Sequence, residues 1–361
     1  MTFPILSLHG RVGRIGVDAL LFNTSENLVS VNLLRISGFT GSDASVLITR
    51  NERHLFTDGR YKTQAKEQAK GFRVHVVKRK LDSLAHTIKT AGIKRLGIES
   101  ARVSHEFVTT LGARIPGIEV APLGRAFLEG LRIRKEPDEK DKVKIAARIA
   151  SDACREILEK GLSGRREIDV AADLEDRFRR LGALGIAFET IVASGLRSAL
   201  PHGTASEKTI AANDLVIIDF GCRYEGYNSD ETVTCSVGPP SARQKSVHKA
   251  VYEAHMRALD AVREGMRVRD VDRVARNSIA EAGYGAYFLH SLGHGVGLEV
   301  HEPPYLSLKG RGVLREGMIF TIEPGVYIEG FGGVRLESLV YLDREGPEVL
   351  STMSKNLIQV H

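Results

Sequence analysis

Residues 215–237 read LVIIDFGCRYEGYNSDETVTCSV, and this stretch decides how the fold is interpreted. Its continuous apolar start, Leu215–Phe220, predicts a buried strand. The segment Thr232–Val237 is rich in β-branched residues and predicts a second strand, with residues 224–227 as the turn between them. Asp219 lies at the end of the first strand and Asp230 directly before the second, so two carboxylates are expected at neighbouring strand ends.

Three further residues with metal-binding side chains occur later in the chain. His294 lies in the glycine-rich segment GHGVG at 293–297, Glu323 follows the predicted strand 318–322, and Glu337 lies in a predicted strand at 334–342. Four carboxylates and one imidazole form an oxygen-rich set, unlike the Cys/His sets of structural zinc sites. Buried together, the carboxylates would repel one another unless cations were present. Because four carboxylates offset the charge of two divalent cations, the pattern predicts the dinuclear site of a hydrolase.

Other chemistry has weaker support in these residues. Taken singly, Asp219 could cap a turn and Glu323 could be a surface carboxylate. The glycines around His294 lack the following Lys-Ser/Thr of a phosphate-binding loop. Prolines directly after His301-Glu302 exclude the HExxH helix of zinc proteases. The sequence has no Gly-x-Ser-x-Gly motif and no cysteine with a nearby catalytic signature, which leaves nucleophilic catalysis as the weaker alternative.

The length of 361 residues predicts two domains rather than one core. Residues 1–125 contain predicted strands at 46–49 and 74–77 with a polar helix at 61–70 between them, which indicates a small α/β domain. A linker is expected at 126–137, and Pro137 suits the start of a helix. The second domain, 138–361, has apolar residues at helical spacing in four places. The predicted helices cover residues 143–160, 167–181, 242–263 and 271–282.

Composition indicates an ordinary soluble protein, with 42% hydrophobic and 27% charged residues. Residues 1–125 hold 19 Lys and Arg against 10 Asp and Glu, a balance of +9, whereas the remainder has a balance of −3. These basic residues are scattered and not interleaved with aromatic ones, so a solvated surface is favoured over nucleic-acid binding. The start of the chain lacks the features of a signal peptide, no segment suits a membrane span, and three cysteines form no disulfide pattern. A cytoplasmic location is expected.

With these motifs in view, the chain resembles the proline-specific metallopeptidases, aminopeptidase P and prolidase. Their "pita-bread" catalytic domain is shared with methionine aminopeptidase and creatinase. Besides the metal-site motifs, the resemblance includes SALPH at 198–202 in the second domain, and GFTGS at 38–42 and TDGRY at 57–61 in the first. Arg132–Lys135, with Glu139, resembles the entry to the catalytic domain. The resemblance implies an α+β pita-bread domain at 138–361, preceded by a creatinase-like N-terminal domain.

The resemblance also implies which residue would bind which metal ion. Asp219 would chelate one metal, and His294 and Glu323 the other. Asp230 and Glu337 would bridge the pair. The family typically uses manganese or cobalt, sometimes zinc or iron, and the oxygen-rich ligands favour hard ions such as manganese.

The remaining roles come from the same resemblance. A hydroxide held between the metals would attack the scissile carbonyl, and Glu323 would manage the proton of that water. His202 and His301 would assist proton movement and stabilise the tetrahedral intermediate. Three residues are expected to line the substrate site: His290, Tyr327 and Arg335.

The expected substrate is a short peptide with proline in second place, because an Xaa-Pro bond is a tertiary amide with no N–H. Three positions depart from the family pattern: Val233 and Tyr305 replace arginines, and Ser338 replaces an acidic residue. Because Tyr305 stands where many prolidases carry a carboxylate-binding arginine, it favours an aminopeptidase P-like enzyme for longer peptides. The alternatives are a prolidase restricted to dipeptides and a non-catalytic binding protein of the same fold. The family also implies a homodimer.

Overall fold

The computed structural model of the chain describes residue 8 and residues 12–361 and divides into two compact units, Met1–Arg132 and Ile133–His361. The break lies within the range 126–137 that the sequence analysis assigns to a linker, whose extent stays a prediction. Apart from Leu8, the segment Met1–Gly10, used above to argue against a signal peptide, lies outside the described residues.

The first unit contains a six-stranded mixed sheet in the order β4-β3-β2-β1-β5-β6. β1 is antiparallel to β2 and parallel to β5. Its residues alternate between two apolar clusters, with Leu20 and Phe22 in one and Ala19 and Leu21 in the other. This strand is therefore buried on both faces. The strands are β1 Ala19–Thr24, β2 Ala44–Thr49, β3 Arg53–Thr57, β4 Arg73–Val76, β5 Arg95–Ile98 and β6 Glu119–Pro122.

Short helices connect these strands. The helix predicted at 61–70 is confirmed as α3, Lys62–Gln68, which follows the 3-10 turn η2, Gly59–Tyr61. The other helical elements of the unit are η1 Gly13–Ile15, α2 Val31–Ser37, α4 Lys80–Thr90, η3 Ser100–Arg102, α5 His105–Arg114 and α6 Arg125–Gly130.

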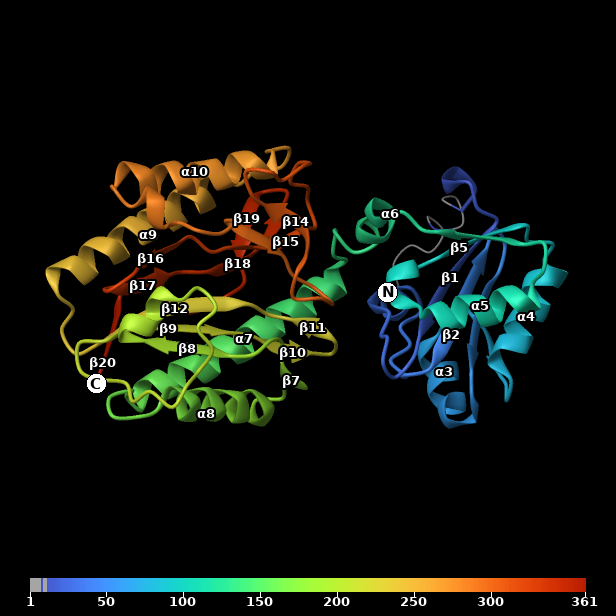
Figure 1. Ribbon diagram of the computed structural model, residues 1–361, viewed down its shortest axis with the longest axis horizontal. Coiled ribbons are helices and arrows are strands. Elements are labelled where there is room, and N and C mark those ends of the chain that lie inside the picture. Colours follow the sequence, from blue (N-terminus) through green and yellow to red (C-terminus); the bar gives the residue numbers. More distant parts are fainter. Residues whose placement is uncertain (1–7, 9–11) are drawn as a thin grey trace. The chain divides into compact units, whose positions relative to one another are not determined.

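In the second unit, two pairs of helices enclose two β layers. Figure 1 shows α7 and α8 on one side of the strands and α9 and α10 on the other. As expected, α7 begins at Pro137, where a capping box satisfies backbone N–H groups. All four predicted helices are confirmed within a few residues. They are α7 Pro137–Glu159, α8 Glu167–Arg180, α9 Ala242–Ala261 and α10 Val268–Glu281.

The two main sheets of this unit have the orders β20-β12-β9-β8 and β14-β13-β15-β18-β19. There are also two small sheets: one has three strands in the order β11-β10-β7, and the other has the two strands β16 and β17. The first-sheet strands are β8 Ile191–Ser194, β9 Leu215–Phe220, β12 Glu231–Val237 and β20 Ile358–Val360. The second-sheet strands are β13 Gly293–Gly295, β14 Glu302–Leu306, β15 Ile319–Ile322, β18 Ser338–Asp343 and β19 Gly346–Val349. The short strands are β7 Gly185–Ile186, β10 Cys222–Tyr224, β11 Tyr227–Asn228, β16 Gly325–Ile328 and β17 Gly332–Arg335, and the 3-10 turns are η4 Gly195–Ala199 and η5 Gly285–Tyr287.

Each helix pair packs on its own sheet through a separate apolar core. Residues of α7 and α8, such as Leu174 and Phe178, cluster with Val216 and Ile218 of β9. Residues of α9 and α10 cluster with Phe320 and other residues of the second sheet. Cys154, Cys222 and Cys235 are free and buried, and buried thiols pack as small apolar side chains. Because the helices cover the outer faces, polar side chains between the sheets can face one another.

One strand prediction is wrong. The single strand predicted at 334–342 is two strands, β17 and β18, which belong to different sheets. The glycine-rich segment 329–333, predicted to join the strands at 318–322 and 334–342, does not do so. Residues 329–331 form the turn between β16 and β17, and Gly332 and Gly333 begin β17. The chain leaves the strand conformation at Leu336 and Glu337, so it changes sheet at the residue predicted to bridge the metals.

An ion pair inside the second unit gives a stability prediction. Lys135 Nζ donates to Glu302 Oε1 at 2.7 Å, and their side chains are only 2% and 1% exposed. Removal of one partner of a buried ion pair leaves the other charge buried without compensation and costs about 3–5 kcal/mol. Lys135→Met is therefore expected to lower the free energy of unfolding by roughly that amount in urea denaturation. Lys144→Met, which removes an exposed partner of Glu348, is the control, and equal effects of the two would contradict the prediction.

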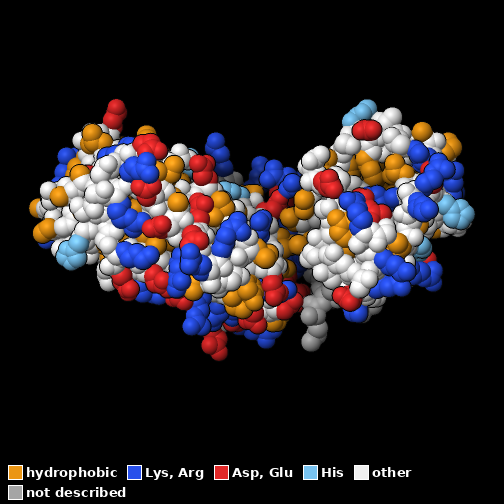
Figure 2. Space-filling view, turned by 90° about the horizontal axis from the view of Figure 1, so that it is seen from below, with side chains coloured by type: hydrophobic (Ala, Val, Ile, Leu, Met, Phe, Trp, Pro, Cys, Tyr) orange, Lys and Arg blue, Asp and Glu red, His pale blue; other side chains and the backbone are white. Residues whose placement is uncertain are grey.

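Two observations describe the distribution of charged and apolar side chains. Figure 2 shows Lys and Arg side chains interspersed with Asp and Glu over the face it displays, rather than gathered into one basic tract. Among the residues that the structure describes, no helix is both long and apolar enough to cross a membrane.

Candidate metal centre

A cleft of about 490 Å³ lies in the second unit and brings together most of the residues singled out in the sequence. All five expected metal ligands line it, as do His202, His290, His301 and Arg335. Tyr327 is not among the lining residues and lies behind His290 and Arg335, to both of which its hydroxyl is hydrogen-bonded. The five expected ligands are Asp219, Asp230, His294, Glu323 and Glu337.

Strand pairing explains why the acidic residues meet. In the first sheet Phe220 pairs with Glu231, so Asp219 and Asp230 lie at the same end of β9 and β12. In the second sheet Ile322 pairs with Ser338, so Glu323 and Glu337 are the next residues outward from that pair. Each sheet therefore contributes two carboxylates at one end, and the backbone N–H of Glu337 donates to Thr232 O at 3.0 Å across the sheets.

Ligand atoms of Asp230, His294 and Glu337 all lie within 4.8 Å of one another, close enough to share an ion. His294 Nε2 lies 3.4 Å from Glu323 Oε1 and 3.6 Å from Asp230 Oδ2. Asp219 Oδ1 is buried and receives no hydrogen bond from any residue that the structure describes. A buried acceptor without a partner costs free energy, and a cation would remove that cost.

The tautomer of His294 also suits a metal ligand. Its Nδ1 lies 3.1 Å from the carbonyl oxygen of Gly295, which can only accept, so Nδ1 carries the proton. Nε2 then presents a lone pair toward the carboxylates. Burial lowers the pKa of His294 to about 4, so the ring is neutral at pH 7. A neutral imidazole of fixed orientation is the form that binds divalent metals.

Burial beside one another raises the pKa values of three of the carboxyl groups, those of Asp230, Glu323 and Glu337. Burial, followed by the charge of Asp219, raises the pKa of Glu337 to about 8. Burial and Glu337 raise the pKa of Asp230 and of Glu323 well above their usual values. Arg335 lowers each of these three pKa values but offsets the effect of burial and repulsion only in part. The donor set therefore fits divalent cations, which would replace the protons.

Arg335 is tied to protein groups through all three guanidinium nitrogens. Nη2 donates to Asp219 Oδ2 at 2.7 Å and Nε to Thr232 Oγ1 at 3.2 Å. Nη1 donates to the carbonyl of Pro201 at 2.9 Å and to the hydroxyl of Tyr327 at 2.7 Å. This geometry fixes the orientation of Asp219, so that one of its oxygens stays available for a metal. Recognition of substrate by Arg335 stays a prediction.

His290 and Tyr327 continue this chain of hydrogen bonds. His290 Nδ1 donates to the carbonyl of Ser291 at 2.8 Å, so its Nε2 accepts from the Tyr327 hydroxyl at 2.9 Å. That hydroxyl oxygen in turn accepts from Arg335. The three residues expected to bind substrate are thus bonded to one another, and their direct contact with substrate also stays a prediction.

Two supporting residues were missed in the sequence. Thr232 Oγ1 donates to Glu337 Oε2 at 2.7 Å, and Thr321 Oγ1 donates to Glu323 Oε1 at 3.3 Å. Strand periodicity could have identified them, because Thr321 lies two residues before Glu323 and Thr232 two residues after Asp230.

The three departures from the family pattern have different consequences. Val233 belongs to the apolar core on the other face of β12, so the residue there does not reach the cleft. Ser338 Oγ is hydrogen-bonded to Nε2 of buried His255 at 3.0 Å. Tyr305 lines the cleft, opposite His294 in the β13–β14 pairing, and is 39% exposed. Only Tyr305 can therefore contact substrate directly.

Known proteins share both units of this chain. Residues 141–344 match metallopeptidase family M24, and residues 5–133 match the creatinase/prolidase N-terminal domain. An Xaa-Pro dipeptidase of Pyrococcus horikoshii is 40% identical over 343 residues, 95% of each chain. The structure of an X-Pro aminopeptidase from Thermotoga maritima has a TM-score of 0.92 at 41% identity, with 97% of this chain and 100% of that one covered. An Xaa-Pro dipeptidase from Bacillus anthracis gives 0.93 at 39% identity, covering 99% of both chains.

These matches confirm the expected fold, a pita-bread domain after a creatinase-like domain. They also confirm that the chain is an enzyme rather than a binding protein, since its family is one of metallopeptidases and none of the five expected ligand positions is lost. The family implies divalent metal ions, in agreement with the chemistry of the donor set. On the geometry of its cleft and on these matches, the chain belongs to metallopeptidase family M24.

Proposed function

We propose that this enzyme is an Xaa-Pro dipeptidase with two divalent cations in its cleft. The observation that carries the proposal is the convergence of four carboxylates and one neutral imidazole in a single cleft. Relatives similar over nearly the whole chain, among them the dipeptidases of Pyrococcus horikoshii and Bacillus anthracis, support the dipeptide preference. This proposal departs from the aminopeptidase P-like activity that Tyr305 favoured in the sequence, because more of the named relatives are dipeptidases.

The cations would be held as the family resemblance implies. Asp219 would bind one ion, His294 and Glu323 the other, and Asp230 and Glu337 both; manganese or cobalt would suit the oxygen-rich set. When bound, the ions supply a Lewis acid for the scissile carbonyl and an activated water for its hydrolysis.

The protein groups would position the substrate and handle protons. Glu323 would accept the proton of the attacking water and later deliver it to the proline nitrogen, which has no hydrogen of its own. His202 and His301 lie on exposed turns of the cleft, where their N–H groups would hydrogen-bond the scissile carbonyl oxygen as it gains charge. Phe188 and Ile191 add apolar surface suited to the proline ring or the residue before it.

Tyr305 keeps an aminopeptidase as the second candidate. A dipeptide ends in a carboxylate directly after the proline, and Arg335 is the only Lys or Arg among the described residues that line the cleft. Because its guanidinium is already bonded on three nitrogens, the histidines would have to meet that carboxylate. A longer peptide would not need this contact, and the X-Pro aminopeptidase of Thermotoga maritima is as similar as the dipeptidases.

A paired assay separates the two activities. Leu-Pro and Leu-Pro-Ala would be compared under identical conditions with manganese and then cobalt. The dipeptidase proposal predicts a kcat/KM at least about tenfold higher for Leu-Pro, the equivalent of one hydrogen bond to a charged group. A preference for Leu-Pro-Ala would establish the aminopeptidase, and hydrolysis of neither peptide with either metal would refute both.

His202 gives a prediction on catalysis that is separate from metal binding. It lines the cleft but is not an expected ligand, so His202→Ala should lower kcat by about 10²-fold while the bound metal is unchanged. Metal content would be measured on the same sample by elemental analysis. Parallel loss of metal and of rate would show that His202 acts through the metal site instead.

A further inference from the structure

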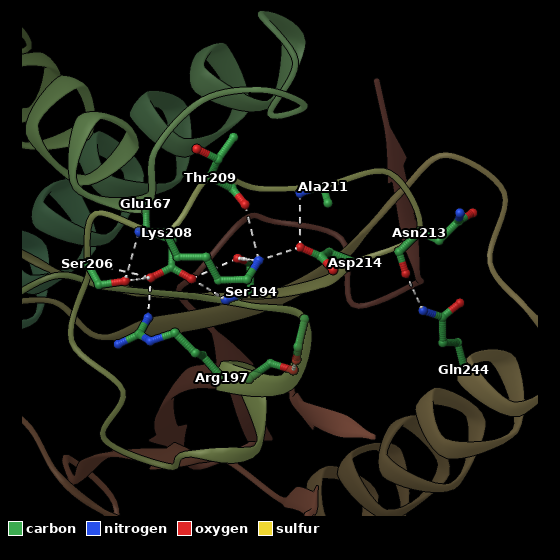
Figure 3. A network of polar contacts seen from close by, with 12 residues as sticks. Glu167, Ser194, Arg197, Ser206, Lys208, Thr209, Ala211, Asn213, Asp214 and Gln244 are labelled. Atoms are coloured by element: carbon green, nitrogen blue, oxygen red, sulfur yellow. Dashed lines mark hydrogen bonds and ion pairs between the residues drawn. The ribbon is translucent and has the colours of Figure 1, made fainter. Parts of the chain in front are cut away.

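Outside the cleft, a buried carboxylate gathers an unusual number of hydrogen bonds. Glu167, the first residue of α8, is completely buried. It accepts from the backbone N and Oγ of Ser194 at 2.8 and 2.7 Å, and from those of Ser206 at 3.2 and 2.7 Å. Its Oε2 also pairs with Nη1 of Arg197. Figure 3 shows Glu167 with these three partners around it. A buried charge requires such hydrogen bonds to offset the loss of water. Glu167 does not line the cleft, so its burial has to be explained by something other than direct contact with substrate.

Arg197 connects this carboxylate to the segment that carries His202. While Nη1 faces Glu167, Nη2 donates to the carbonyl of Thr204 at 2.7 Å, seven positions later in the chain. One planar guanidinium thus ties together both ends of residues 197–204, and His202 lies between them. The fixed fork of the guanidinium sets the angle between its two partners, which a lysine could not do.

The opposite side of the segment is held by β17 and its last residue. The backbone N–H of Gly333 donates to Ser198 Oγ at 2.8 Å, and a Cβ at Gly333 would lie 2.2 Å from the carbonyl oxygen of Ser198. The carbonyl of Pro201 accepts from Arg335, which also holds Asp219. The turn with His202 is therefore attached on one side to the metal-site strands and on the other to Glu167.

The network also reaches the strand that carries Asp219. Lys208 Nζ donates to Ser194 Oγ at 2.7 Å and to Asp214 Oδ2 at 2.6 Å. Asp214 directly precedes β9, and Figure 3 shows Lys208 lying between Ser194 and Asp214. The start of α8, the end of β8, the His202 segment and the start of β9 are thus joined by one set of buried and half-buried polar groups.

We propose that Glu167 and Arg197 are positioning residues that hold the His202 turn in register with the metal-binding carboxylates. The inference rests on the proposed catalytic role of His202. Neither Glu167 nor Arg197 lines the cleft, and Arg197 reaches it only through its bond to the carbonyl of Thr204, a lining residue. Their effect would be on the placement of His202, and a displacement of about 1 Å of a catalytic group can lower the rate by about 10²-fold.

Arg197→Ala is expected to lower kcat by about 10- to 100-fold with little change in KM or in bound manganese. Hydrogen exchange followed by mass spectrometry should become faster in peptides covering 195–204 and stay unchanged at 215–220. Arg197→Lys keeps the charge but lacks the second arm, so it should restore only part of the rate. Arg166→Ala is the matched control, because Arg166 also connects α8 to the segment between η4 and β9, through Asp169 and Glu207, but on an exposed surface.

Combining Arg197→Ala with His202→Ala tests whether the two residues act through one another. If Arg197 serves His202, its loss should cost little once His202 is absent. Additive losses in the double variant, unchanged exchange at 195–204, or full rescue by Arg197→Lys would overturn the proposal. Faster exchange in Arg197→Ala together with full activity in His202→Ala would instead refute the proposed role of His202, and the positioning role with it.

Discussion

Replacement of Asp230 by Asn is expected to abolish peptide hydrolysis while the fold is retained. Asp230 is 5% exposed, and its ligand atom lies within 4.8 Å of those of His294 and Glu337. Loss of a group that merely orients a metal ligand costs about 10–100-fold, so loss of a ligand shared by two ions should exceed ~10²-fold. An amide has nearly the same shape as a carboxylate but only one acceptor oxygen and no charge.

The fold should survive because a neutral amide replaces a carboxyl group whose neutral form burial already favours. Burial and the neighbouring carboxylates already raise the pKa of Asp230 well above its usual value, so the metal-free protein does not depend on its ionised form. Asp230→Asn should therefore unfold at the wild-type temperature or above without metal, and lose the stabilisation that manganese gives the wild type. Asp343→Asn, at the half-buried end of β18 away from the cleft, is the control. Wild-type activity or wild-type stabilisation by manganese in Asp230→Asn would remove Asp230 from the site.

The convergence of the five expected metal ligands in one cleft could be predicted from sequence because their pattern is local. Asp219 and Glu323 lie at the ends of apolar strands, where a carboxylate must lose water, and that cost indicates a partner. The pairing register of the strands was not needed for this prediction, because the ends of the hydrophobic runs show where the strands end. The same runs place α8, α9 and α10 within a few residues. Aminopeptidase and dipeptidase could not be separated, because that choice depends on which cleft group meets the end of the peptide.

The wrong strand at 334–342 shows what local pattern cannot reveal. Val334, Leu339 and Val340 are all buried, so the apolar pattern runs without a break through two strands. The chain changes sheet at Glu337, whose backbone N–H bonds to Thr232 in the other sheet. That change depends on a partner about a hundred residues away. The bonds of Arg335 to Asp219 and to the carbonyl of Pro201 also join residues far apart in the sequence. The sequence therefore predicted a substrate-binding role for Arg335 but not these contacts.

Metal affinity is expected to rise with pH, and the metal-free protein to lose stability over the same range. The pKa of Glu337 is raised from 4.5 to about 8 in the folded protein, and those of Asp230 and Glu323 are raised well above normal. A carboxyl whose pKa is raised on folding binds its proton more tightly in the native state. Its contribution is fully present below its unfolded pKa and is lost as the pH rises through the folded value. The metal-free protein should thus become less stable between pH 4.5 and about 8.

Manganese must displace these protons to bind, so its affinity should increase across that window and the added thermal stability should grow with pH. Calorimetric titrations at pH 7 in two buffers of different ionisation enthalpy would measure the protons released, and melting curves with and without manganese would give the stability. Glu337→Gln removes one titrating carboxyl and should release fewer protons than the wild type, with weaker binding. Binding without proton release, or a metal-free protein that gains stability from pH 5 to about 8, would mean that these carboxyls are already ionised and balanced by charges of the protein itself.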